Sequence, residues 1–279
     1  MCFKHIIITR FNLTGAWLND KNGKKVLGLD WLEDRYELFL DYCFPSIKNQ
    51  SCQNFEWWVY FDENTPKKYK RINCELSNQY ENFKPKYEAS YESFQMNMPI
   101  EITELLRTLD EDILVTTRID NDDMFTDNTI ELIQRNVNLT NCGSIIEFPF
   151  GYILEKGKIC SFRKINSELN AFISYIEKIK PNKNVDTIYY MEHKRWRDKN
   201  RIKIAQKEQW IQIVHNSNVL NRATGQFVSF KEVNKFTSVL FDNLKFENDV
   251  ILFFKKIKYG LGVKKYRVLK KIRMLRAAK

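Results

Sequence analysis

Apolar and polar residues follow one another along most of the chain in blocks that favour a layered α/β domain. Short, largely apolar runs bounded by polar residues are typical of buried strands. Such runs predict strands at 4–10, 55–61, 113–117, 186–191 and 210–214. The run at 6–8 is too short for the core of a signal peptide, so we interpret it as part of a buried first strand.

Helical spacing of apolar residues and turn signals complete the predicted elements. Helices are expected at 31–44, 102–109, 129–137 and 167–179, and a mostly helical region at 227–254. Pro45 is expected to end the first helix, and Thr126 or Asp127 to cap the third. Two runs, 144–154 and 158–163, predict a hairpin around Gly157.

The composition is that of a globular protein, with 43% hydrophobic and 14% aromatic residues. No apolar run approaches the roughly 20 residues needed to span a bilayer. Six scattered cysteines show no CxxC spacing, so we expect buried free thiols and a reducing cytoplasm.

The net charge of +10 is concentrated at the C-terminus. Residues 255–279 hold eleven Lys or Arg and no acidic residue, whereas the first 254 residues hold 34 basic and 35 acidic ones. We therefore divide the chain into a nearly neutral domain, 1–254, and a basic tail, 255–279, and expect no nucleic acid partner for the domain. Helical spacing of Val268, Leu269, Ile272 and Leu275 predicts a basic amphipathic helix at an anionic membrane surface. A solvated helix or a disordered tail is the alternative.

The strand at 113–117 runs directly into Asp120, Asn121, Asp122 and Asp123. Three carboxylates this close repel one another unless a cation holds them. In α/β sheets, ligands bind beyond the carboxyl ends of strands. Oxygen ligands on a short turn suit Mg²⁺ or Mn²⁺ together with substrate phosphates. The alternative is a solvated acidic turn before a helix.

Residues 117–123, Thr-Arg-Ile-Asp-Asn-Asp-Asp, resemble the "tRlDnDD" signature of the bacterial putative rhamnosyltransferase family, a GT-A-like glycosyltransferase group. Further blocks at 5–12, 35–62 and 210–218 resemble that family in the same order. The resemblance covers roughly residues 5 to 222. It implies a single α/β, GT-A-like (Rossmann-like) domain with a mixed central sheet, to which we add a helical C-terminal extension.

The resemblance also implies which residues bind a nucleotide-sugar donor. Thr9 and Arg10, at the end of the first strand, are candidate nucleotide contacts. Asp62, at the end of the second, is a candidate contact to the base or ribose. Arg118 would pair with a phosphate or brace the acidic turn.

The family's acidic signature implies the metal site. Asp122 is the expected direct ligand, and Asp120 a ribose contact or water-mediated metal ligand. Asp123 would make a second contact to metal or sugar in the catalytic centre. His215 matches a late histidine that completes the metal site in many GT-A enzymes, and neutral imidazole suits Mn²⁺.

An inverting transfer also needs a carboxylate base, whereas a retaining one does not. We prefer Glu177, which the sequence places on the helix predicted at 167–179, and keep Glu192 and Asp186 as alternatives.

The expected function is transfer of a sugar from a nucleotide-sugar donor to a saccharide or lipid-linked glycan acceptor, with Mn²⁺ or Mg²⁺ as cofactor. The expected setting is surface polysaccharide or lipopolysaccharide synthesis in the cytoplasm, at the inner face of a membrane. One rival is a metal-dependent phosphohydrolase or nuclease, which also uses clustered carboxylates. The other is a non-catalytic basic binding protein directed by its tail.

Overall fold

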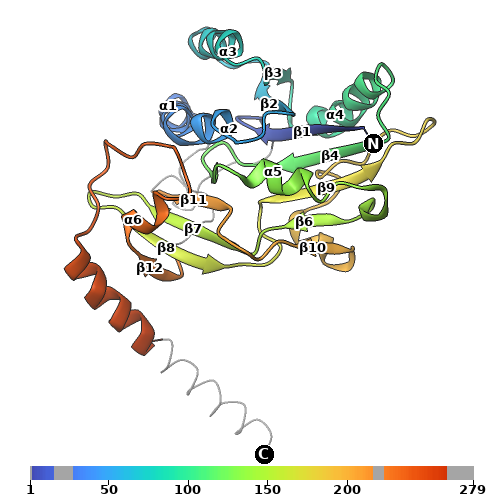
Figure 1. Cartoon of the computed structure of the whole chain (residues 1–279). Coiled ribbons are helices and arrows are strands. Elements are labelled where there is room, and N and C mark those ends of the chain that lie inside the picture. Colours follow the sequence, from blue (N-terminus) through green and yellow to red (C-terminus); the bar gives the residue numbers. More distant parts are fainter. Residues whose placement is uncertain (1, 16–27, 216–222, 263–279) are drawn as a thin grey trace, which may run out of the picture.

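The computed structural model describes residues 2–15, 28–215 and 223–262, and its strands form two sheets (Figure 1). The larger sheet has the strand order β10-β6-β9-β4-β1-β2-β3, with β1 Phe3–Arg10, β2 Glu56–Asp62, β3 Phe83–Glu88, β4 Ile113–Arg118, β6 Ile145–Glu147, β9 Ile173–Lys178 and β10 Arg201–Lys203. The smaller has the order β12-β8-β7-β11-β5, with β5 Met124–Phe125, β7 Phe150–Glu155, β8 Ser161–Asn166, β11 Trp210–Val214 and β12 Gln226–Val228.

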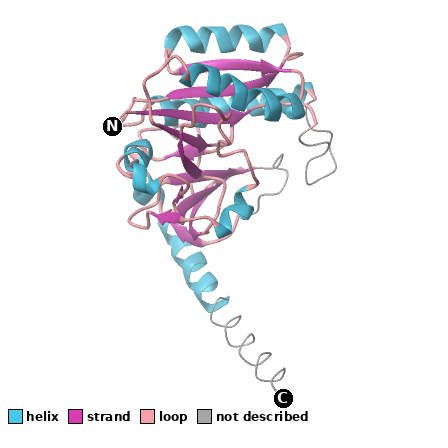
Figure 2. Cartoon of the chain, turned by 90° about the vertical axis from the view of Figure 1, so that its right-hand side faces the viewer, coloured by secondary structure: helices cyan, strands magenta, loops and turns pink. Residues whose placement is uncertain are grey.

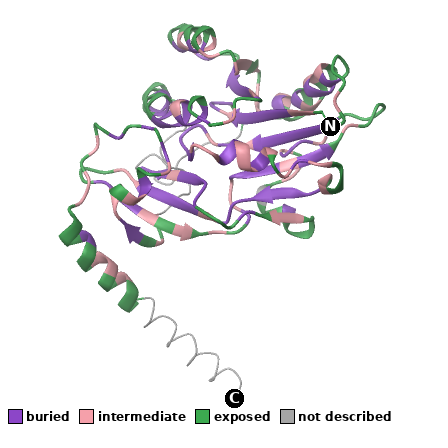
Figure 3. Ribbon diagram, viewed as in Figure 1, coloured by how far each residue is buried: buried purple, intermediate pink, exposed green. Residues whose placement is uncertain are grey.

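The strands β1, β2, β3 and β4 are parallel, and β9 runs antiparallel between β4 and β6. Parallel strands are buried on both faces, which matches their largely apolar sequences. One face packs against α1 (Leu29–Leu38), α3 (Lys67–Gln79) and α5 (Thr129–Gln134). The other packs against α4 (Tyr91–Leu106). The central strands are coloured as buried along most of their length (Figure 3). The structure thus confirms the predicted α/β class with a mixed central sheet.

The first predicted helix does not end at Pro45. A π-helical turn, Phe39–Cys43, joins α1 to α2 (Phe44–Lys48), and the helical path continues to Lys48. Pro45 lies in the first turn of α2, after the π turn has already interrupted the regular hydrogen-bond ladder. Its missing N–H therefore costs little there.

The helix predicted at 167–179 is wrong, because this segment forms β9 between β4 and β6. Aromatic and β-branched residues suit a strand that is buried in a sheet. The predicted strand at 186–191 is also wrong, since it forms a turn in which Thr187 has a φ of 64°. The predicted hairpin is confirmed as β7 and β8, although residues 145–147 belong to the other sheet.

Three helix predictions need correction. The N-cap of α5 is Asn128, whereas the Asp127 carboxylate accepts hydrogen bonds from the Ser238 backbone N–H (2.9 Å) and hydroxyl (3.1 Å). Helix α4 begins at Tyr91, after a capping box formed by Ser90 and Ser93, and not at residue 102 as predicted. The region 227–254 is mostly irregular, apart from the end of β12, α6 (Phe230–Val233) and the start of a helix at 249–262.

The C-terminal helix, residues 249–262, projects from the body of the molecule (Figure 2). The remainder of the basic tail, 263–279, lies outside the described residues. Within the described ranges, no helix is both long and apolar enough to cross a bilayer. All six cysteines are free, but only Cys43 and Cys160 are buried, and Cys2 and Cys74 are exposed.

Candidate active site

The acidic turn, residues 120–123, connects the two sheets. It follows β4 and leads into β5, which pairs antiparallel with β11 through Phe125 and Trp210. The same pairing brings the end of β11 to the turn. The Ile213 backbone N–H donates to Asp123 Oδ1 at 3.0 Å, and His215 Nε2 lies 3.2 Å from Asp122 Oδ2. The structure therefore brings together Asp122 and His215, which the sequence had proposed as metal ligands.

A glycine and a tryptophan fix the position of β11. A Cβ on Gly151 of β7 would lie 2.1 Å from the Trp210 indole, so only glycine allows this contact. The Trp210 ring also stacks on Phe172 with centroids 4.6 Å apart, and its Nε1–H donates to the Phe148 carbonyl at 2.8 Å. This packing fixes Trp210, the first residue of β11, and so positions the strand beside the acidic turn.

Asp122 is buried but charged. Arg35, on α1, forms an ion pair with its Oδ2, and His215 contacts the same oxygen. Burial by itself raises the pKa of Asp122, but Arg35 and His215 outweigh it and hold the pKa well below its usual range. The carboxylate therefore stays ionised inside the protein.

Asp123 and Asp120, the other two acidic residues of the turn, have different surroundings from Asp122. Burial, followed by the charges of Asp122 and Asp120, raises the pKa of Asp123 well above its usual range. In the described part of the chain, its Oδ2 is buried and has no hydrogen-bond partner. Asp120 pairs with Arg118 Nη2 at 3.2 Å and is 34% exposed, so a ligand can reach it. The turn thus presents Asp120 and Asp122 as carboxylates, and Asp123 as a brace for β11.

The donor atoms of the turn fit a hard divalent cation, although they do not enclose one. Across the described ranges, no three His, Cys, Asp or Glu side chains converge closely enough to hold a metal ion by themselves. Mg²⁺ commonly binds one or two carboxylates and completes its coordination with substrate phosphates. The residues suited to this are Asp122 and Asp120, with His215 beside them.

Two arginines flank Tyr189 beside the turn. The Arg10 guanidinium carbon lies 5.2 Å from the Tyr189 ring centroid and 5.3 Å from that of Tyr91, and the Arg118 carbon lies 5.6 Å from Tyr189. Arg10 and Arg118 end the adjacent parallel strands β1 and β4, which places both at the same edge of the sheet. Among the described residues, both Nε atoms are buried without a hydrogen-bond partner. Two guanidinium groups with unused donors form a site suited to phosphate.

Thr9 and Asp62 are the other predicted contacts to the nucleotide-sugar donor, but their side chains already form hydrogen bonds within the protein. Thr9 is fully buried, and its hydroxyl accepts a hydrogen bond from Trp57 Nε1 at 3.0 Å inside the core. The Asp62 carboxylate accepts from the backbone N–H groups of Asn64 (2.8 Å) and Thr14 (3.3 Å). These residues shape the ends of β1 and β2.

The structure does not bring Glu177 to the turn. On β9 it pairs with Leu114, near the start of β4, whereas the acidic turn follows the end of that strand. Its carboxylate accepts from the backbone N–H groups of Asp186 (2.9 Å) and Thr187 (3.2 Å), so Asp186 is also at that end. Glu192 follows Tyr189, whose ring contacts Arg118 beside the turn, by three positions, and its charge is one of several that raise the pKa of Arg118. Burial lowers that pKa, but Asp120, Tyr189 and then Glu192 raise it.

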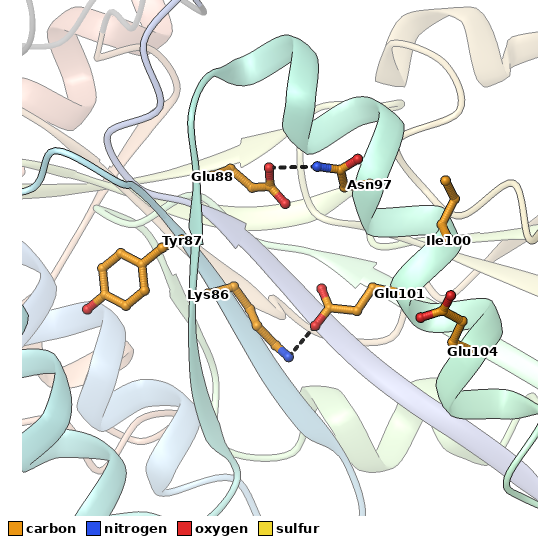
Figure 4. Close-up of a pocket in the computed structure, with 7 residues that line it drawn as sticks. All are labelled: Lys86, Tyr87, Glu88, Asn97, Ile100, Glu101 and Glu104. Atoms are coloured by element: carbon orange, nitrogen blue, oxygen red, sulfur yellow. Dashed lines mark hydrogen bonds and ion pairs between the residues drawn. The ribbon is translucent and has the colours of Figure 1, made fainter.

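A surface hollow between β3 and α4 is a separate feature (Figure 4). Two pairs of its lining residues interact: Lys86 forms an ion pair with Glu101, and Asn97 Nδ2 donates to Glu88 Oε2 at 3.0 Å. Strand β3 is the edge strand, two strands away from β1. We assign this hollow no part in the chemistry.

Sequence reasoning missed Arg35 and Tyr189. Arg35 lies within the block that resembles the family, but nothing in its spacing indicates that it reaches Asp122. Tyr189 lay in a segment wrongly predicted as a strand. Their contacts join segments far apart in the chain, such as the 87 positions between Arg35 and Asp122.

A mixed sheet in which the parallel strand β4 runs into an acidic turn, joined there to a smaller sheet, is the arrangement expected for a GT-A-like fold. Comparison with known families agrees with that class. Residues 4–226 match the family described as "Putative rhamnosyl transferase". The chain therefore belongs to the putative rhamnosyl transferase family.

Several solved structures are similar at low sequence identity. Residues 1–349 of S. aureus TarS in complex with UDP-GlcNAc share 11% identity, with a TM-score of 0.45 over 81% of this chain and 62% of that one. A putative nucleotide-diphospho-sugar transferase from Desulfovibrio desulfuricans G20 shares 8% identity, with a TM-score of 0.35 over 77% of this chain and 82% of that one. The chain thus spans about 60% of the length of TarS 1–349. No curated protein matches the chain.

Proposed function

We propose that this enzyme transfers a sugar from a nucleoside-diphosphate donor to a saccharide acceptor, with the diphosphate bound between the arginines and the acidic turn. The observation that carries the proposal is the convergence of Arg10 and Arg118 at Tyr189, with Asp120 bound to Arg118. Two guanidinium groups at neighbouring strand ends offer the positive charge that a diphosphate needs. The Asp120 carboxylate is partly exposed beside Arg118, so it could also contact the ribose or a hydrated ion.

We further propose that Asp122 binds Mn²⁺ or Mg²⁺ directly, with Asp120 as a second or water-mediated ligand and His215 beside it. A bound ion would stabilise negative charge on the departing diphosphate. Asp123 would keep β11 and the turn together through its hydrogen bond from the Ile213 backbone N–H. Arg10 and Arg118 would bind and orient the donor phosphates.

If the transfer inverts configuration, we propose Glu192 as the base in place of Glu177. Glu192 is exposed, and its charge acts on Arg118 at the edge of the proposed donor site. Glu177 lies toward the opposite end of the sheet and is held by two backbone N–H groups. A base must reach the acceptor hydroxyl, which the position of Glu192 favours.

We propose that the acceptor is a lipid-linked or surface glycan, and that the enzyme works at the inner face of a membrane in surface polysaccharide or lipopolysaccharide synthesis. The support is the C-terminal helix, 249–262, which extends away from the body (Figures 1 and 2). Its exposed apolar residues are Val250, Ile251, Phe253, Phe254, Ile257 and Leu261. Lysines at 255, 256 and 258 and the basic sequence that follows add positive charge, which attracts anionic lipid.

The rival functions have less support. A phosphohydrolase or nuclease usually gathers further carboxylate or histidine ligands, and the described ranges hold no such cluster. A non-catalytic binding protein gives no reason for two arginines at neighbouring strand ends beside an acidic turn.

Donor hydrolysis tests the proposed function. The protein is incubated with UDP-, GDP- and dTDP-sugars, with Mn²⁺ or with EDTA, and release of the nucleoside diphosphate is measured. We expect release from at least one donor, stimulated by Mn²⁺ and lost in Asp122→Asn. Absence of hydrolysis and of nucleotide binding across the panel would contradict the proposal.

A further inference from the structure

Arg35 reaches the acidic turn from α1 and contacts two of its residues. Its Nη1 forms the ion pair with Asp122 Oδ2 and also donates to Asn121 Oδ1 at 3.3 Å. Its guanidinium carbon lies 4.9 Å from the centroid of the Trp31 ring, one helical turn earlier. The side chains of Arg35 and Asp122 are only 8% and 9% exposed. Arg35 is therefore a buried cation held against the turn by packing as well as by charge.

Arg35 contacts the carboxylate that is proposed as the direct metal ligand. Asp122 Oδ2 already faces the Arg35 guanidinium and, at 3.2 Å, His215 Nε2. A divalent cation at this carboxylate would lie beside a buried positive charge, where solvent screens repulsion weakly. The ion and the guanidinium therefore compete for Asp122.

The turn is also fixed on its other side, which limits how far Asp122 can move away from Arg35. Asn121 Nδ2 donates to the Phe11 carbonyl at 2.9 Å, next to the end of β1, and Asp123 is bound to Ile213. The competition between Arg35 and a divalent ion for Asp122 is thus relieved mainly if Arg35 moves or if a ligand brings negative charge to the site.

We propose that Arg35 is a positioning residue that holds Asp122 in the free protein and makes divalent-ion binding depend on the nucleoside diphosphate. The identity of the ion and of the diphosphate rests on the proposed function. A diphosphate brings negative charge and further oxygen ligands, which offset the repulsion between Arg35 and the ion. The ion therefore enters with the donor and binds the free protein weakly.

A Mn²⁺ titration of the metal-free protein, without nucleotide, tests this competition, with free Mn²⁺ followed by electron paramagnetic resonance. Arg35→Gln removes the positive charge and keeps a planar group that can contact Asn121. We expect it to bind Mn²⁺ about tenfold more tightly or better, because a charge adjacent to the ligand oxygen is gone. Arg35→Lys retains the charge and should stay close to the wild type.

Two further variants show whether the gain arises at Asp122. Adding Asp122→Asn to Arg35→Gln should abolish it. Arg201→Gln is the matched control, because Arg201 pairs with the fully buried Glu147, away from the turn, and its loss should give no gain. Unchanged Mn²⁺ affinity in Arg35→Gln, a gain that survives Asp122→Asn, or an equal gain in Arg201→Gln would each overturn the proposal.

The wild-type protein provides a measurement that does not depend on any variant folding. Mn²⁺ should bind it weakly alone and more tightly with the nucleoside diphosphate that the donor panel identifies. Equal affinity in both conditions would overturn the role of Arg35, while nucleotide binding itself would leave the proposed function standing. Failure of every nucleotide to bind would instead reject the proposed function, and the nucleotide-free titration of Arg35→Gln would still decide the competition.

Discussion

His215 Nε2 lies 3.2 Å from Asp122 Oδ2, although 93 positions separate the two residues in the chain. The contact exists because β5, directly after the acidic turn, pairs with β11, directly before His215. The smaller sheet therefore completes the site that the larger sheet begins.

The contact between Gly151 and Trp210 should be essential to that arrangement. Gly151→Ala places a methyl group where the indole lies, so we expect a loss of about 1–3 kcal/mol in the free energy of unfolding. Chemical denaturation measures this loss. Gly157→Ala is the control, because its nearest neighbour would lie at an ordinary 3.6 Å. Equal stability of the two variants would show that the indole moves aside freely.

The buried His5 should make stability depend on pH. Its Nε2 bonds the Thr117 hydroxyl at 2.7 Å and its Nδ1 contacts Gln134 Nε2 at 3.1 Å, while burial lowers its pKa from 6.5 to about 3. The unfolded chain therefore binds a proton between these two pH values that the folded protein does not. The His5 contribution is complete above about pH 6.5 and falls by up to about 1.4 kcal/mol per unit as pH drops toward 3.

Denaturation of the wild type and of His5→Gln between about pH 4 and 7 measures this dependence. In His5→Gln, the free energy of unfolding should change less with pH, because the contribution of one proton to that slope is lost. Parallel slopes for the two proteins would show that His5 is protonated in the folded state.

Part of this account was available from the sequence, and the limits are physical. The strands 113–117 and 210–214 were predictable because each is a compact apolar run, and the acidic turn stood out because three like charges adjoin one of them. The β9 segment was misread as a helix because its role depends on pairing with β4 and β6, which local spacing does not encode. Glu177 was misplaced with it. Arg35 and Tyr189 are defined by contacts across the fold.

The two candidate bases should respond differently to mutation. If the transfer inverts configuration, Glu192→Gln should lower kcat by about 10²–10⁴-fold with little change in the donor KM, as expected for loss of a general base. Glu177→Gln keeps an acceptor oxygen for the Asp186 and Thr187 N–H groups and should retain near wild-type turnover. Steady-state kinetics with the acceptor compare the two. Greater loss in Glu177→Gln would exclude Glu192 as the base.

The C-terminal helix should bind anionic membranes. Phe253→Ser with Phe254→Ser removes exposed aromatic surface, and we expect loss of co-sedimentation with vesicles that contain phosphatidylglycerol. Leu240→Ser is the matched control, since Leu240 is also exposed but lies outside the helix. Wild-type binding should weaken with salt, as screening predicts. Equal binding to purely zwitterionic vesicles would contradict an electrostatic contribution, and concentration-dependent self-association without vesicles would indicate a second copy as the partner.

The central claim is that Arg10 and Arg118, beside the acidic turn, hold a nucleoside diphosphate. Calorimetric titration of UDP, GDP and dTDP in the presence of Mn²⁺ tests it most directly, with the wild type compared with Arg118→Gln and Arg10→Gln. The account predicts that one nucleotide binds the wild type, and that each substitution weakens it by about tenfold or more, because each removes a charge-assisted contact. Unaltered affinity in both variants, or no binding by the wild type, would contradict it.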